Sequence, residues 1–350
     1  MKYLENRFRE ELGQGELVDL DNGVVKISGM AFESLDILEI ASFNKEKPTV
    51  YDQAFDAWRQ DHVAEKIDQA NSILNEGDQF DRFLALQQRY ARNKLLPFVG
   101  AGMSFESGFP LWRDFLLALR RQTNLDEKAF VDLLNQGGYE EAAEQIATAM
   151  TPQAFSEAIY NKYGLPREIC GVVHMLPDIF SGSVITTNFD HMIRDVYSIA
   201  KKSFTQELLG YEAANIRSCL EDGSVLLKLH GNAEHGKSRV LTKSEYATHY
   251  EAGDRLKNLL GVFADRFSLL FLGCSLSKDR PIQTLKTYID AHGYEDMPKH
   301  YAFMEIPPTD EARIYREREL SLHHIYPIWY PRKMHEESIA ALLIKLREDL

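Results

Sequence analysis

The chain has 350 residues, with 40 Lys and Arg against 53 Asp and Glu and a formal charge of −13 at pH 7. This length suits about two domains or one large α/β domain, and the acidic balance argues against a free-standing nucleic-acid binder, which needs cations to replace phosphate counterions. Three cysteines, Cys170, Cys219 and Cys274, form no CxxC pair, so a zinc module with its closely paired ligands is not expected.

The first residues, MKYLENRFREELG, are charged throughout and lack the apolar stretch of a secretory signal peptide. No apolar run approaches the roughly 20 residues that a membrane span requires. Sparse, unpaired cysteines suit a reducing compartment. Together these features predict a cytoplasmic protein that does not insert into a membrane.

Residues 1–90 differ in character from the rest and are expected to form an N-terminal extension. ELVDLDNGVVKISG alternates apolar and polar residues around Asp-Asn-Gly, which predicts a β-hairpin. Two later segments, TVYDQAFDAWRQDHVAEKIDQANSILNEG and DRFLALQQRYARNK, carry apolar residues at helical spacing. Because the region holds no chemical motif, we expect either an assembly or docking element of a homo-oligomer, or extra helices packed on the core.

From residue 91 to residue 350, predicted strands and helices alternate. Strands are expected in LLPFVGAG, SVITTNFD, SVLLKLHGN, SLLFLGCS, HYAFMEI and HIYPIWYP, and a short one begins SRVLTKSEYATHY before its helix. Residues 121–163 read as an inserted helical lobe. Apolar strands that alternate with helices predict an α/β fold with a doubly wound, mostly parallel sheet covered on both faces.

Four of these strands end in small or polar residues: VGAGMS, ITTNFD, LKLHGN and FLGCSLSKD. In a parallel sheet such ends gather at one edge, where ligands bind. Glycines there let backbone N–H groups approach a ligand, and a helix N-terminus favours phosphate. Taken alone, each feature is a weak signal: a glycine pair after a strand is more often a plain turn, Thr-Thr-Asn and the serines can cap helices, and a lone histidine is usually an ordinary surface or core residue. Their convergence on one edge is what indicates a site.

These segments resemble the sirtuin-like NAD-consuming domains of bacteria. The matching stretches, in the family's order, are GAGMSFESGFPLW (100–112), TTNFD (186–190), LHG (229–231) and GCSLSKD (273–279), and the resemblance covers about residues 90–350. The chain lacks the two cysteine pairs of the zinc ribbon in protein-deacetylating sirtuins, and Thr187 stands where those enzymes usually have Gln. The resemblance is therefore to the zinc-free branch, whose members hydrolyse NAD and often serve in anti-phage defence.

The resemblance implies NAD as substrate, no metal, and a role for each matching residue. Asn188 would bind a ribose hydroxyl or position the attacking water, and Asp190 would accept a hydrogen bond from the nicotinamide amide, stabilise positive charge on the ribose, or cap the next helix. His230, with a reference pKa of ~6.5, would be the general base. Trp112 is explained equally well as a core residue and Arg113 as a surface ion-pair partner. Substrate contacts are expected from Gly100, Ala101, Gly102, Ser104, Pro110, Trp112, Arg113, Thr187, Gly231, Gly273 and Ser275.

The expected function is an NAD glycohydrolase that releases nicotinamide and ADP-ribose and so depletes cellular NAD. Two alternatives remain open: a non-catalytic module that senses NAD or ADP-ribose, and an ADP-ribosyltransferase. The presence of both Asn188 and His230 argues against a degenerate site. The resemblance also suggests a separately encoded partner, either a HerA-like hexameric ATPase or another phage sensor.

Overall fold

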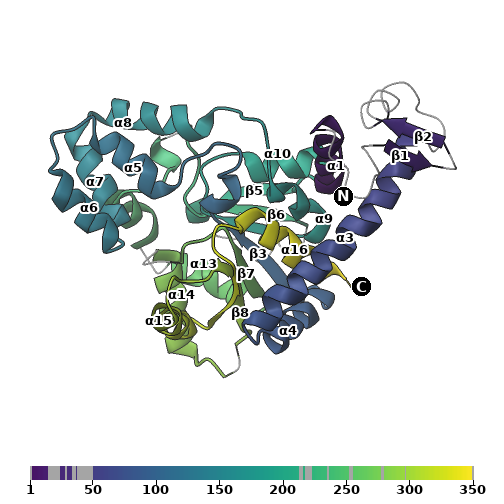
Figure 1. The fold of residues 1–350 in the computed structure, drawn as a ribbon. Helices are drawn as coiled ribbons and strands as arrows, with labels where there is room; N and C mark the ends of the chain where they lie inside the picture. Colours follow the sequence, from purple (N-terminus) through teal and green to yellow (C-terminus); the bar gives the residue numbers. More distant parts are fainter. Residues whose placement is uncertain are drawn as a thin grey trace.

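The computed structural model describes residues 2–14, 24–27, 30–33, 37, 50–212, 216, 223–234, 236–251, 255–276, 280–295 and 297–348. Within them lies one seven-stranded sheet in the order β5-β6-β4-β3-β7-β8-β9, and every pairing in it is parallel (Figure 1). The expected doubly wound α/β class is confirmed. The strands are β3 (Leu95–Val99), β4 (Val184–Thr186), β5 (Gln206–Leu209), β6 (Val225–Lys228), β7 (Ser268–Leu272), β8 (His300–Glu305) and β9 (Ile325–Tyr330).

Both faces of the sheet are buried, which is why its strands read as apolar runs rather than as alternating patterns. In β7, Leu270 and Leu272 belong to one hydrophobic core, and Leu269 and Phe271 belong to the core on the opposite face. The first core is completed by α3 (Val50–Glu76), α4 (Phe80–Ala91), α9 (Leu176–Ile179), α10 (Met192–Ile199) and α16 (His335–Arg347), and the second by α13 (Arg255–Ala264), α14 (Arg280–His292) and α15 (Asp310–Ser321).

Four helices form the helical lobe to one side of the sheet (Figure 1), and their buried apolar residues join the first core. They are α5 (Trp112–Arg120), α6 (Glu127–Asn135), α7 (Tyr139–Ala149) and α8 (Pro152–Ile159). Local sequence sets two of their beginnings. The Asp126 side chain accepts a hydrogen bond from the Ala129 N–H, and Thr151 does the same for Ala154 ahead of a proline at the first helical position.

The N-terminal segment contains α1 (Lys2–Gln14) and an antiparallel pair, β1 (Val24–Ile27) with β2 (Met30–Glu33), near the outer end of α3 (Figure 1). The Asp-Asn-Gly turn that the sequence predicts, at 21–23, lies outside the described residues. Phe8 of α1 packs against Tyr51 and Trp58 of α3, with ring centroids 5.3 Å apart in both pairs. Aromatic contacts therefore join α1 to α3, whose opposite end packs on the sheet core.

The sequence prediction failed at two places. No strand forms in the described residues 236–242, because the backbone N–H groups of Leu241 and Thr242 donate to the Glu245 carboxylate instead of to a neighbouring strand. A helical turn, α12 (Lys243–Tyr246), follows. Strand β5 was not predicted, because it is an edge strand and its first two residues are exposed. None of the helices in the described part of the chain has the length and apolar character needed to cross a bilayer.

One buried amide connects α4 to the edge of the sheet. Gln79, 3% exposed, donates from Nε2 to the backbone oxygens of Ile73 (3.2 Å) and Trp329 (3.0 Å), and its Oε1 accepts from the Trp329 N–H at 2.6 Å. The side chain therefore satisfies backbone groups of both α3 and β9.

We expect Gln79→Ala to lower the free energy of unfolding by about 2–4 kcal/mol, because each buried polar group left without a partner costs about 1–3 kcal/mol. Urea titration measures this loss. Gln60→Ala, at an exposed position of α3, is the matched control. Equal stability of the two variants would contradict the role given to Gln79.

Candidate active site

A cavity of about 900 Å³ lies at the carboxyl ends of the central strands, against the helical lobe. Strand order reverses between β3 and β7, so this edge is the switch point at which open parallel sheets bind ligands. The sheet, the lobe and α12 all contribute to the wall, which includes Gly100, Trp112, Gly138, His230, Tyr246 and Gly273.

The glycines after β3 and β7 allow two backbone turns to touch. The N–H groups of Gly100 and Gly102 donate to the carbonyls of Leu272 and Gly273, both at 2.9 Å. A Cβ on Gly100 would lie 2.6 Å from the Gly273 oxygen, and one on Gly273, whose φ is +64°, would lie 2.5 Å from the Met103 nitrogen. The glycines after β3 therefore allow the turn after β7 to come close. Because the N–H groups of Gly100 and Gly102 already donate to this turn, they are not available to bind a ligand.

A buried polar network lies directly beneath the glycine turn. Asn188 donates from Nδ2 to the Gly100 carbonyl (3.1 Å) and to Ser104 Oγ (3.0 Å). Ser104 in turn donates to Asp190 Oδ2 at 3.0 Å, and Asp190 Oδ1 accepts from the Met192 N–H at 3.1 Å, at the start of α10. Asn188 Oδ1 is buried and has no hydrogen-bond partner among the described residues. The network fixes the amide and leaves its acceptor oxygen for a ligand.

A buried lysine holds the backbone of the loop that carries Asn188 and Asp190. Lys228, 1% exposed at the end of β6, donates from Nζ to the carbonyls of Phe189 (3.1 Å) and Asp190 (2.8 Å). Burial raises the pKa of the Asp190 carboxyl, and the nearby Lys228 charge opposes that shift. Burial also lowers the pKa of Lys228, against the influence of Asp190. The ammonium group stabilises the backbone that presents Asn188 and Asp190.

His230 follows β6 and lines the cavity. Its Nε2 lies 2.5 Å from the Tyr246 hydroxyl, and the two rings meet edge to face with centroids 5.7 Å apart. Burial lowers the pKa of His230 to about 4, although the adjacent backbone of Thr187 acts in the opposite direction. The imidazole is consequently neutral at pH 7, which is the form that can accept a proton.

An aromatic cluster closes one side of the site. The Trp112 ring packs edge to face on Phe189 (4.8 Å between centroids) and against Tyr163 (5.3 Å), whose hydroxyl donates to the Pro110 carbonyl at 3.1 Å. Trp112 therefore belongs to the packing and also borders the cavity. A second hollow of about 10 Å³ lies beside it, lined by Ala101, Ser104, Pro110, Asn188 and Asp190 among others.

The structure brings most of the sequence-predicted site residues together. Two of them need separate comment. Arg113 donates to Asn135 Oδ1 at 2.8 Å rather than to a carboxylate. Gly231 is not among the described residues that line either hollow; its φ is +73°, and a Cβ there would lie 1.6 Å from the Ser238 oxygen. The main cavity is lined by Gly100, Ala101, Gly102, Trp112, Arg113, Thr187, His230, Gly273 and Ser275, and the small hollow by Ala101, Ser104, Pro110, Trp112, Asn188 and Asp190.

Sequence reasoning missed three site residues. Lys228 had a visible signal, because it is a lone charged residue within the apolar strand VLLKL. Tyr246 had none, since nothing local indicates which histidine its hydroxyl meets. Arg280 was also missed: it borders the cavity and forms an ion pair with Glu140 of the lobe at 2.8 Å.

No group of three or more His, Cys, Asp and Glu side chains in the described ranges is placed to hold a metal ion. Cys219 lies outside those ranges. The expectation that the chain binds no zinc stays a prediction.

Residues 182–328 match the family model of the SIR2-like domain. This range contains Asn188, Asp190, His230 and Gly273, while the glycine turn after β3 precedes it. The sirtuin-like resemblance of the sequence is confirmed.

The curated relatives carry the name NAD(+) hydrolase ThsA. The protein from Acinetobacter baumannii (strain 532279) is 24% identical over 263 residues, which is 74% of this chain and 52% of the relative. Those from Cytobacillus dafuensis and Enterococcus faecium are 23% and 25% identical over 59% of this chain, and over 40% and 42% of their own lengths. The chain thus spans about half the length, or less, of the curated relatives it matches.

The contact between the two glycine turns leads to a stability prediction. We expect Gly273→Ala to lower the free energy of unfolding by about 1–3 kcal/mol, because a side chain at positive φ is strained and this Cβ would collide with Met103. Gly182→Ala is the control, since a Cβ there meets nothing within 4 Å. Chemical denaturation of both variants decides, and a Gly273→Ala variant as stable as the control would show that the turn tolerates a side chain.

Proposed function

We propose that the SIR2-like domain of this chain hydrolyses the nicotinamide–ribose bond of NAD⁺. The observation that carries the proposal is that Asn188 and neutral His230 follow the neighbouring strands β4 and β6 at the switch point of the sheet, where His230 lines the main cavity and Asn188 lines the small hollow. The names of the relatives, NAD(+) hydrolases, support the same reaction.

The reaction consumes water: NAD⁺ and H₂O give nicotinamide, ADP-ribose and a proton. Nicotinamide leaves as a neutral molecule, so the site does not need to protonate it. Its tasks are to hold the dinucleotide, to stabilise positive charge on the ribose and to orient the nucleophile. In this proposal Asn188 Oδ1 accepts from a ribose hydroxyl or the water, Asp190 stabilises the ribose cation or binds the nicotinamide amide, and His230 takes up the proton.

We propose that residues 91–350 form the catalytic unit, with the inserted helices at 121–163 over the cleft, and that the protein acts in anti-phage defence by depleting NAD. An unregulated NADase would harm its own cell. The activity must therefore be controlled, and we propose that assembly controls it. In this proposal the chain forms a homo-oligomer, residues 1–90 contribute to its contacts, and a HerA-like ATPase or another phage-sensing protein is the partner. Light scattering of the purified chain, alone and with a candidate ATPase, tests the assembly.

We expect the purified chain to convert NAD⁺ to nicotinamide and ADP-ribose. His230→Ala should lose ~10²–10⁴-fold of this turnover, the usual contribution of a general base, and Asn188→Ala should also abolish it, because the ribose or the water is no longer oriented. Chromatography of the products measures the reaction, and circular dichroism verifies the fold. The matched controls are Asn124→Ala and His292→Ala, at exposed positions.

Near-wild-type turnover in both site variants would refute the site. NAD⁺ that binds without being consumed would favour a sensing module. Transfer of ADP-ribose to protein would favour an ADP-ribosyltransferase.

The pH dependence follows from the pKa of His230, which is about 4 in the folded protein instead of about 6.5. The neutral imidazole is the active form, so the His230 contribution to kcat/KM is present above this folded pKa and is lost as pH falls through it. Between pH 8 and pH 5.5 we therefore expect no acid limb with a midpoint near 6.5. A limb at 6.5 that disappears in His230→Gln would contradict this assignment.

A further inference from the structure

The side chain that holds His230 does not come from the sheet. Tyr246, 3% exposed, ends α12, and its hydroxyl lies 2.5 Å from His230 Nε2. α12 is a single α-helical turn of four residues that continues directly into the π-helical turn Ala247–Glu251, and a helix this short has no stability of its own. The position of the Tyr246 hydroxyl is therefore set by what holds these two turns, which is the sheet, through the Tyr250 hydroxyl that donates to the Leu229 carbonyl, and the lobe.

The segment around α12 is internally rigid. The Glu245 carboxylate accepts from the N–H groups of Leu241 (2.8 Å) and Thr242 (2.9 Å), and Thr242 Oγ1 accepts from the Glu245 N–H at 3.2 Å. These bonds form a capping box. Residues 241–246 are consequently placed as one unit, with Tyr246 at its end.

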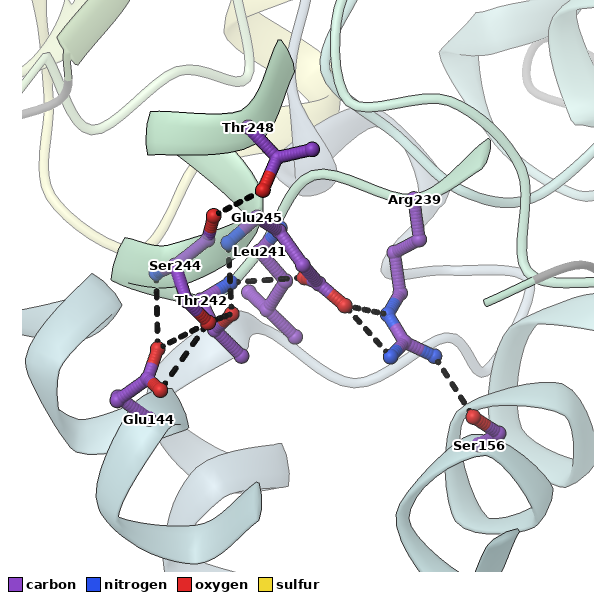
Figure 2. Close-up of polar contacts among 8 residues, drawn as sticks. All are labelled: Glu144, Ser156, Arg239, Leu241, Thr242, Ser244, Glu245 and Thr248. Atoms are coloured by element: carbon purple, nitrogen blue, oxygen red, sulfur yellow. Dashed lines mark hydrogen bonds and ion pairs between the residues drawn. The ribbon is translucent and has the colours of Figure 1, made fainter. Parts of the chain in front are cut away.

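Two helices of the lobe approach this unit from opposite sides, α7 directly and α8 through Arg239 (Figure 2). On α7, Glu144 accepts from the Ser244 N–H at 2.9 Å and from Ser244 Oγ at 2.9 Å. On the α8 side, Arg239 pairs with Glu245 at 2.7 Å and reaches Ser156 Oγ at 3.4 Å. Burial raises the pKa of Glu144, but the hydrogen bonds from Ser244 outweigh it and the net pKa lies below its usual value, so this contact carries a charge at neutral pH.

A further contact joins the lobe to the tyrosine itself. The Arg280 guanidinium lies 4.9 Å from the centroid of the Tyr246 ring and pairs with Glu140 of α7 at 2.8 Å. A cation over an aromatic face is attracted to the electron-rich ring. The lobe thus holds both the helix that carries Tyr246 and the ring of Tyr246.

We propose that Tyr246 is a positioning residue for His230, and that the helical lobe sets its place through α12, so that His230 is oriented for catalysis while the lobe is docked. The inference rests on the proposed function for its kinetic consequences. Its structural content, a lobe that controls the environment of one imidazole, does not require NAD turnover.

The first test removes one hydroxyl. In Tyr246→Phe we expect kcat to fall by about 10-fold or more, but by no more than the ~10²–10⁴-fold that loss of the general base itself costs, while KM for NAD⁺ changes by less than about threefold. The ¹⁵N NMR signals of the His230 ring should move, because Nε2 loses its partner. Tyr288→Phe, which removes a hydroxyl bonded to Asp265, is the control and should leave both readouts unchanged. A changed KM with unchanged kcat, or an unmoved His230 signal, overturns the proposal.

The second test loosens the lobe at a distance from the histidine. Glu144→Ala removes the acceptor for Ser244 and should lower kcat in the same direction as Tyr246→Phe and disturb the same His230 signals. Glu157→Ala, at an exposed position of α8, is the matched control. Since both changes act through one contact, the double variant Glu144→Ala/Tyr246→Phe should lose no more kcat than Tyr246→Phe alone. Independent, multiplying losses overturn the coupling.

The two proposals fail in different ways. If the wild-type chain releases no nicotinamide, the proposed function fails. The NMR signals of His230 in Tyr246→Phe, Glu144→Ala and their two controls still decide the positioning role. If the wild-type chain is active but Tyr246→Phe and Glu144→Ala behave like their controls, the proposed function stands and this inference falls.

Discussion

The close contact between the turns after β3 and β7 is the constraint on which the site depends. Two N–H···O bonds of 2.9 Å connect the turns, and a Cβ on Gly100 or Gly273 would stand 2.6 Å or 2.5 Å from opposing backbone atoms. The strands β3, β4 and β7 end at one level, since Val99 pairs with both Thr186 and Leu272, and only glycine permits the turns after β3 and β7 to come this close. Ser104 and the Gly100 carbonyl are then presented to Asn188, and the cavity opens beside them.

The polar groups of the candidate site are held in place by burial and hydrogen bonds rather than by exposed charge. Asn188 and Asp190 are 3% and 5% exposed, and each is held by hydrogen bonds that leave little freedom of orientation. Lys228 stabilises the carbonyls of the same loop from inside the protein. Burial also keeps His230 neutral. Such fixed dipoles need no reorganisation when charge develops on a substrate, which is how preorganised sites lower a barrier.

The helical lobe is connected to His230 through side-chain contacts that lead to Tyr246. Its acidic side chains Glu140 and Glu144 bind Arg280 and Ser244. Arg280 lies over the Tyr246 ring, and Ser244 belongs to the same helical turn as Tyr246. These contacts are polar and partly exposed, so each is individually weak. Apolar residues of the lobe, among them Phe115, Ile146 and Phe155, also belong to the hydrophobic core of one sheet face, so the polar contacts add to this packing and do not hold the lobe by themselves.

The sequence by itself determined the parallel α/β class and the edge at which the site lies, because apolar strands that end in glycine, Thr-Thr-Asn, His-Gly and Gly-Cys-Ser carry both signals locally. It did not determine which partner each polar group meets. Lys228, Tyr246 and Arg280 lie 38, 16 and 140 residues from the groups they contact. Edge strand β5 carried too little apolar character to be found, and residues 238–242 looked like a strand because the Glu245 carboxylate that satisfies their N–H groups is invisible to a periodicity argument. Only the tertiary structure decided these pairings, since chain folding, not local preference, sets the distances between such groups.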